Sequence, residues 1–171
     1  CLVKNSLRLR EFGKKCLIIT GQTSSKLNCS LEDSILALEN ENIKYVIFDK
    51  IEETPTLSTV EKAYRENKEK GIDFILAVGG GSAIDAAKAI SILFKHDISK
   101  EELLSRKNLK GIPIVAVPTT AGTGSEANPY SILAMPEEGV NKNIGQQVFP
   151  VLAFLDARYT LNMTYELTVC T

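Results

Sequence analysis

The chain has 171 residues, of which 44% are hydrophobic and 24% charged, a composition typical of a soluble globular protein. Its 20 basic and 21 acidic residues are interspersed and leave a formal net charge of −1, which argues against a nucleic-acid or acidic-membrane partner. No apolar run approaches the roughly 18 residues of a membrane span and no signal peptide begins the chain, so we expect one cytoplasmic domain over 1–171.

Strand and helix patterns alternate along the sequence. Short apolar runs rich in β-branched residues predict buried strands at 15–20, 44–48, 74–78, 112–117 and 150–155. Helical spacing predicts helices capped by Ser30, opened by Thr56, running from Ser82 to Lys95, and capped by Ser99. A polar loop is expected after the first strand and a hairpin turn at 136–139. This order predicts an α/β fold: a doubly wound, Rossmann-like parallel sheet with right-handed crossovers.

The most informative segment runs from the strand at 74–78 through Gly79, Gly80 and Gly81 directly into a helix. Residues without Cβ let a ligand oxygen approach bare N–H groups, and the amides and dipole at a helix start favour an anion. The segment therefore predicts a cradle for a nucleotide pyrophosphate. A turn that only satisfies backbone geometry is the alternative, because the third glycine of G-x-G-x-x-G is replaced by Ile84.

Two further features bear on this cradle. Ser82 and Asp85 have the spacing of a capping box, in which the carboxylate would shape the loop. The residues at 118–126, which follow the strand at 112–117, contain three threonines and a serine among small residues. Because the carboxyl ends of parallel strands lie side by side, we expect this hydroxyl-rich loop and the glycine turn to face one crevice.

Together, residues 79–88 and 118–126 closely resemble two motifs of the iron-containing (group III) alcohol dehydrogenases, and the similarity extends over nearly the whole chain. The resemblance implies the family's N-terminal dinucleotide-binding domain, nearest to the NADP-dependent butanol and 1,3-propanediol dehydrogenase branch. It implies cofactor contacts at these positions: Gly80, Gly81, Ser82, Asp85, Thr119, Thr120, Thr123, Ile132 and Lys142. Lys142 as a solvated hairpin lysine and Ile132 as a core residue are the alternatives.

The choice of nucleotide depends on the end of the first strand. Many NAD-using members of the family carry an Asp there, whose carboxylate binds the adenosine ribose, whereas this chain has Gly21. The residues that follow offer hydroxyls, amides and a cation to a 2′-phosphate, namely Thr23, Ser24, Ser25 and Lys26. A charge-assisted bond contributes about 1.5 to 3 kcal/mol, so the resemblance favours NADP over NAD. A polar surface loop without a cofactor role is the alternative.

The metal site of the family cannot be assembled from this sequence. The resemblance implies Fe²⁺ or Zn²⁺ held by one Asp and three His of a helical C-terminal domain, whereas this chain has a single histidine, His96. The four cysteines have no C-x-x-C spacing for zinc. We therefore expect no metal ligand and no catalytic residue within 1–171, a domain truncated at both ends, and no activity of this part alone.

In the full-length protein, the resemblance implies hydride transfer between NADP(H) and a primary alcohol or diol, or the corresponding aldehyde. The partner would be that small molecule, and a homo-oligomer is possible. Two alternatives stay open. An enzyme like glycerol dehydrogenase or dehydroquinate synthase shares the fold and the glycine cradle, and a non-enzymatic nucleotide-binding module would fit if the chain were complete.

Overall fold

A five-stranded parallel sheet with the order β2-β1-β3-β4-β7 forms the centre of the molecule. The structure is a computed structural model and describes residues 1–144 and 146–170, without the side chains of Ser24 and Cys170. The strands of this sheet are β1 (Lys15–Gly21), β2 (Lys44–Ile51), β3 (Phe74–Gly79), β4 (Ile114–Pro118) and β7 (Leu152–Ala153). A separate antiparallel hairpin consists of β5 (Ile132–Met135) and β6 (Val140–Asn143). These strands confirm the predicted α/β, Rossmann-like fold.

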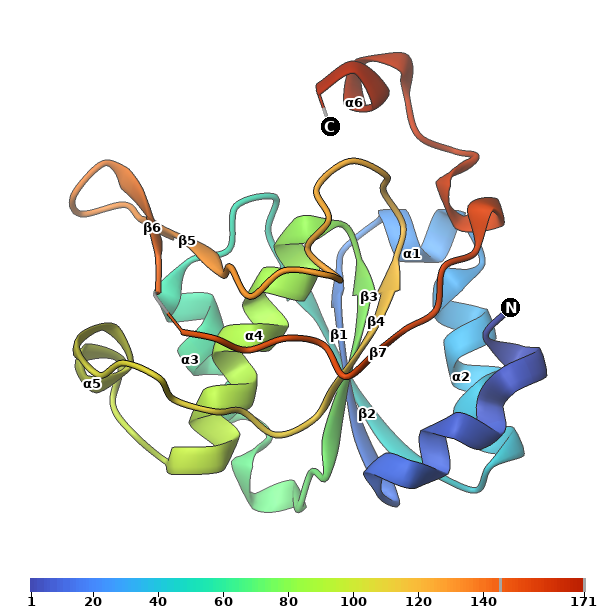
Figure 1. The fold of residues 1–171 in the computed structure, drawn as a ribbon, viewed down its shortest axis with the longest axis horizontal. Helices are drawn as coiled ribbons and strands as arrows, with labels where there is room; N and C mark the ends of the chain where they lie inside the picture. The colour runs from blue at the N-terminus through green and yellow to red at the C-terminus, as the bar shows by residue number, and fades with distance from the viewer. Residues whose placement is uncertain (145, 171) are drawn as a thin grey trace.

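Helices cover both faces of the sheet, as Figure 1 shows. One face carries α3 (Leu57–Arg65), α4 (Gly81–His96) and α5 (Lys100–Ser105), with a 3-10 turn η2 (Lys68–Lys70). The other carries η1 (Val3–Phe12), α1 (Ser24–Leu27), α2 (Ser30–Asn40) and the 3-10 turn η3 (Ala157–Thr160). The last helix, α6 (Tyr165–Cys170), lies above the carboxyl ends of the strands (Figure 1).

Alternate residues of each strand enter two separate cores, because successive strand side chains point to opposite faces. In β3, Ile75 and Ala77 pack with the α3–α4 side, whereas Leu76 and Val78 pack with the α2–η1 side. All four are fully buried. This explains why the strands read as continuous apolar runs instead of alternating ones.

Most predicted elements are confirmed, including two of the helix starts. Thr56 caps α3 by accepting a bond from the Thr59 N–H, and Ser99 forms a complete capping box with Glu102. The hairpin turn lies between β5 and β6 as expected.

Several local predictions are wrong. Ser30 is the first residue of α2 instead of its cap, and its N–H donates to the Asn28 side chain at 3.1 Å. The expected polar loop after β1 contains the helical turn α1. The strand expected at 150–155 shrinks to the two residues of β7 at the sheet edge, which pair only with Val115 and Ala116 of β4. Within the described part of the chain, none of the helices has the length and apolar character needed to cross a membrane.

Candidate functional site

The carboxyl ends of β1, β3 and β4 meet at one edge of the sheet. Gly79 pairs with Pro118, and the Thr119 N–H donates to the Gly79 carbonyl at 3.0 Å. A cleft of about 430 Å³ opens there. Its walls include residues of the loop after β1, the glycine turn and the hydroxyl-rich loop: Gly21, Thr23, Gly80, Gly81, Ser82, Thr120 and Thr123. The expectation that the glycine turn and the loop at 118–126 share one crevice is confirmed.

The glycine turn lies so close to the hydroxyl-rich loop that a Cβ on Gly80 or Gly81 would force the loop to move by a few tenths of an ångström. A Cβ on Gly81 would lie 3.1 Å from the Ser125 Oγ and 3.2 Å from the Thr123 Oγ1. A Cβ on Gly80 would lie 3.1 Å from the Thr120 Oγ1. The N-terminus of α4 therefore lies directly against a row of hydroxyl groups, and both border the cleft. An anion in the cleft could accept bonds from both amides and hydroxyls.

Two hydroxyls of this loop lack hydrogen-bond partners. The Oγ1 atoms of Thr119 and Thr120 are buried, and neither makes a hydrogen bond within the described residues. Buried polar groups in proteins are almost always paired, since leaving one unpaired costs about 1 to 3 kcal/mol. Both threonines also line a smaller hollow of about 190 Å³ between the loop after β1 and η3, with Asn28 and Tyr159. Thr120 also lines the cleft, whereas Thr119 is not among its walls.

Ser82 and Asp85 do not form the predicted capping box. The cap of α4 is Gly80, without a side-chain bond, and the Ser82 hydroxyl donates to the Glu53 carbonyl. The Asp85 carboxylate accepts from the Lys88 ammonium at 3.2 Å and from the Ile132 N–H at 3.0 Å. Because no side chain caps α4, its first amides stay available to a ligand. Asp85 supports the site through its bonds to Lys88 and to the Ile132 N–H.

The segment after β1 is placed at the cleft only in part. Gly21 and the exposed Thr23 line it, whereas Lys26 pairs with Asp49 at 2.8 Å and is not among its walls. Ser25 was expected to offer its hydroxyl to the ligand, but its side chain is fully buried and accepts a bond from Thr20 at 2.6 Å. Ser25 therefore supports the loop from inside. The side chain of Ser24 lies outside what the structure describes.

The hairpin residues differ from each other in their placement. Ile132 is 38% exposed and lines a second hollow of about 420 Å³, which adjoins the cleft and shares Gly81, Ser82 and Thr123 with it. Lys142 pairs with Glu138 at 2.6 Å on the exposed strand β6 and is not among the residues lining either hollow. Ile132 is thus at the site, while Lys142 would have to leave its ion pair to reach it.

Lys88 lies beside the site, although it lines neither the cleft nor the second hollow, and sequence reasoning missed it. It is fully buried, although it lies on α4 among apolar residues. Burial lowers the pKa of its ammonium, and the facing carboxylate of Asp85 opposes this shift. The Asp-x-x-Lys spacing on the predicted helix was the available signal, since residues three apart on a helix can form an ion pair.

The described residues do not fit a metal site. They contain no group of three or more His, Cys, Asp or Glu side chains that could hold an ion. The Nε2 of His96 lies 2.9 Å from the Lys110 carbonyl, beyond the end of α4 that is remote from the glycine turn. His96 is exposed and is the last residue of α4.

Comparison with known proteins agrees with this geometry. Residues 1–157 match the family model "Iron-containing alcohol dehydrogenase". The chain is 45% identical to an iron-containing alcohol dehydrogenase from Thermotoga maritima, with a TM-score of 0.91 over 98% of this chain and 47% of that structure. It is 34% identical to a probable NADH-dependent butanol dehydrogenase of Bacillus subtilis, over 94% of this chain and 42% of the relative.

A further relative is the long-chain primary alcohol dehydrogenase of Thermoanaerobacter ethanolicus, 29% identical over 88% of this chain and 41% of the relative. The chain thus spans less than half the length of the relatives it matches. The family match favours the iron-containing group over the glycerol dehydrogenase and dehydroquinate synthase group. The family model matches most of the chain, crystal structures of iron-containing alcohol dehydrogenases share its fold, and the chain has the glycine cradle. This chain therefore belongs to the iron-containing alcohol dehydrogenase family.

Proposed function

We propose that residues 1–171 bind the nicotinamide dinucleotide of an enzyme that transfers hydride between NADP(H) and a primary alcohol or diol, or the corresponding aldehyde. The observation that carries this proposal is the pair of buried, unbonded hydroxyls of Thr119 and Thr120 beside the glycine turn. The names of the relatives support the substrate class, since they include a long-chain primary alcohol dehydrogenase and butanol dehydrogenases.

The residues at the cleft would divide the binding between them. The amides at the start of α4, at Gly80, Gly81 and Ser82, would bind the pyrophosphate, aided by the positive end of the helix dipole. The hydroxyls of Thr119, Thr120 and Thr123 would donate from the opposite wall. When bound, the dinucleotide supplies the hydride chemistry, while these residues hold and orient it.

We favour NADP because the position that would carry a ribose-binding carboxylate is Gly21. A Cβ there would come no closer than 3.5 Å to the Ile51 carbonyl, so the missing side chain is not explained by crowding. Two observations oppose this preference. Glu52 and Glu53 line the same cleft, and several relatives are named NADH-dependent. The carboxylate of Glu52 is turned toward α3, where it accepts from the Thr59 hydroxyl at 2.5 Å.

The test compares NADPH and NADH affinities of the wild type with those of Gly21→Asp and Gly21→Asn. In Gly21→Asp, the new carboxylate should repel the 2′-phosphate and bind the free ribose hydroxyls, shifting the NADPH:NADH affinity ratio by about tenfold or more toward NADH. Gly21→Asn is nearly isosteric but uncharged, so it should shift the ratio far less. An unchanged ratio in Gly21→Asp would exclude this role for Gly21, and a wild type that prefers NADH would refute the NADP proposal.

We also propose that residues 1–171 bind the nucleotide without oxidising alcohol. The support is the donor set, because the described residues provide no cluster that could hold the family's metal. Mixing the chain with NADP, Fe²⁺ and butan-1-ol should therefore produce no NADPH absorbance. Sustained turnover would show that a metal site exists within this chain. A cytoplasmic location and a homo-oligomeric state stay predictions.

A further inference from the structure

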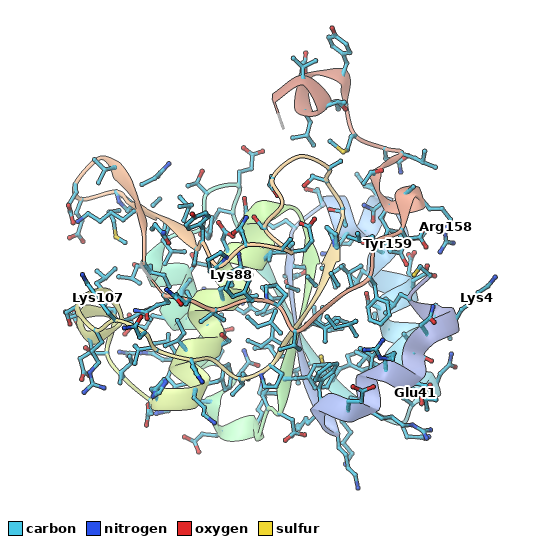
Figure 2. All side chains as sticks on the ribbon, viewed as in Figure 1. Lys4, Glu41, Lys88, Lys107, Arg158 and Tyr159 are labelled. Carbon is cyan, nitrogen blue, oxygen red and sulfur yellow. The ribbon has the colours of Figure 1, made fainter. Side chains whose placement is uncertain are left out.

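Lys88 is a charged side chain buried deep inside the molecule. It has no exposed surface, whereas the labelled lysines Lys4 and Lys107 lie at the periphery (Figure 2). Its ammonium donates to three acceptors: the Asp85 carboxylate at 3.2 Å, the Asn128 side-chain oxygen at 3.3 Å and the Tyr130 carbonyl at 2.5 Å. Asp85 is on the same helix, but the other two belong to the segment between β4 and β5.

These acceptors link Lys88 to the loop that faces the glycine turn. The Asn128 amide nitrogen donates to the Gly124 carbonyl at 2.9 Å, and its oxygen also accepts from the Tyr130 N–H at 2.9 Å. On the other side, the Ser131 hydroxyl donates to the Asp85 carbonyl at 2.7 Å. The ammonium thus bonds α4 directly to Asn128 and Tyr130, and it is linked to the tip of the segment only through the Asn128 bond to Gly124.

The other bonds at the tip lie within the segment itself: the Ala127 N–H donates to the Gly124 carbonyl at 2.9 Å and the Ser125 N–H to the Thr123 Oγ1 at 3.4 Å. Ala121, Gly122 and Thr123 are exposed, and Gly124 has a φ of +62°. A mobile tip would leave the distance between Gly81 and the hydroxyls of Thr123 and Ser125 undefined. Stability alone does not require a lysine here, because replacing buried ion pairs by apolar side chains is often neutral or stabilising. The chemistry instead fits a clamp that fixes a binding geometry.

We propose that Lys88 is a positioning residue for the dinucleotide site: it holds the loop at 123–130 against α4 and so sets the position of the loop hydroxyls at the cleft in which the pyrophosphate binds. This inference rests on the proposed nucleotide-binding function. Lys88 itself touches no ligand in this account, since its ammonium has no exposed surface and donates only to protein atoms. Its acceptor residues line the hollow of about 420 Å³ that adjoins the cleft. Replacing Lys88 should therefore change ligand affinity only through Asn128 and the loop.

The experiment measures binding of two probes to wild type, Lys88→Met, Asn128→Ala and the double variant. NADPH contains the pyrophosphate. Adenosine 2′-monophosphate lacks it and reports binding only in the region of Gly21 and Thr23. Lys95→Met is the matched control, because Lys95 is an exposed lysine on the same helix. Urea unfolding of each variant establishes that it is folded under the binding conditions. If Lys88→Met does not fold, Asn128→Ala carries the test, since it leaves the buried Asp85–Lys88 pair intact.

Each single variant should lose about tenfold in NADPH affinity, because the loop must then be ordered by the ligand. The double variant should lose no more NADPH affinity than the single variant with the larger loss, because both residues act through the same link. The affinity for adenosine 2′-monophosphate should stay within about twofold of the wild type. Unchanged NADPH binding in folded Lys88→Met or Asn128→Ala would overturn the inference, as would an equal loss for both probes. If the wild type binds neither NADPH nor NADH, the proposed function fails and this inference falls with it.

Discussion

At the scale of single residues, the hydroxyls of Thr119 and Thr120 are the most telling feature. Both are buried and make no hydrogen bond within the part of the chain that the structure describes, whereas the buried hydroxyl of Ser25 is bonded to Thr20. A protein that needed only a stable loop could have valine at these positions, since valine has the same shape and no polar group to leave unpaired. We infer that the threonines are kept for a ligand.

Replacing Thr119 by Val should therefore separate stability from binding. The free energy of unfolding should stay the same or rise by up to about 1 kcal/mol, because an unsatisfied hydroxyl is removed. NADPH affinity should fall by roughly threefold to tenfold with the loss of one donor. Thermal melting and fluorescence titration measure the two effects.

Thr59→Val is the comparison for stability, because the Thr59 hydroxyl donates to Glu52 at 2.5 Å. Its loss should cost about 1 kcal/mol. If Thr119→Val were destabilised as much as Thr59→Val, the Thr119 hydroxyl would have a structural partner and the argument would be wrong.

At the scale of elements, the site depends on how closely α4 approaches the loop after β4. The helix begins at Gly81 without a side-chain cap, directly opposite Thr123 and Ser125. Glycine is needed there for the approach and not for the backbone conformation, since the positive φ value of the turn belongs to Gly79. A side chain at Gly81 should therefore damage binding more than folding.

Gly81→Ala tests this separation. The new Cβ would meet the Ser125 Oγ at 3.1 Å, so the loop must move by a few tenths of an ångström, while alanine favours the helix by up to about 1 kcal/mol. We expect dinucleotide affinity to fall by about tenfold, with little change in melting temperature.

Gly71→Ala should show the opposite pattern. Gly71 has a φ of +62° and open space around it. It precedes β3 and so lies at the amino ends of the strands, opposite the cleft. The left-handed conformation should cost alanine about 1 to 2 kcal/mol of stability and leave nucleotide affinity unchanged. Equal affinities for wild type and Gly81→Ala would contradict the close approach as the basis of the site.

At the scale of the whole molecule, the fold was predictable where local signals and tertiary context agree. The strand at 74–78 and the turn into α4 combine an apolar run with glycines, and both are confirmed. The two-residue length of β7 could not be predicted, since it depends on how many residues pair with β4 and not on the apolar run at 150–155.

The parts of the site that escaped prediction depend on which way a side chain faces. The sequence cannot reveal that Ser25 points inward, or that Asp85 turns to Lys88 and away from a cap. Such choices are made by neighbours distant in the sequence, such as Ile132, Asn128 and Tyr130. The spacing of two residues can indicate a possible hydrogen-bonded pair. The packing of the folded chain determines which partner each side chain actually bonds.

The central claim, that a dinucleotide binds between the glycine turn and the hydroxyl-rich loop, is tested most directly by amide hydrogen exchange with and without NADPH. At a ligand concentration of 100 times Kd, binding should stabilise the native state by about 2.7 kcal/mol. We predict that the added protection is largest at 79–85, at 118–126 and around Gly21. Protection centred instead on the hollow between α3 and α5, which Tyr64 and Lys100 line, or no protection at saturation, would contradict the account.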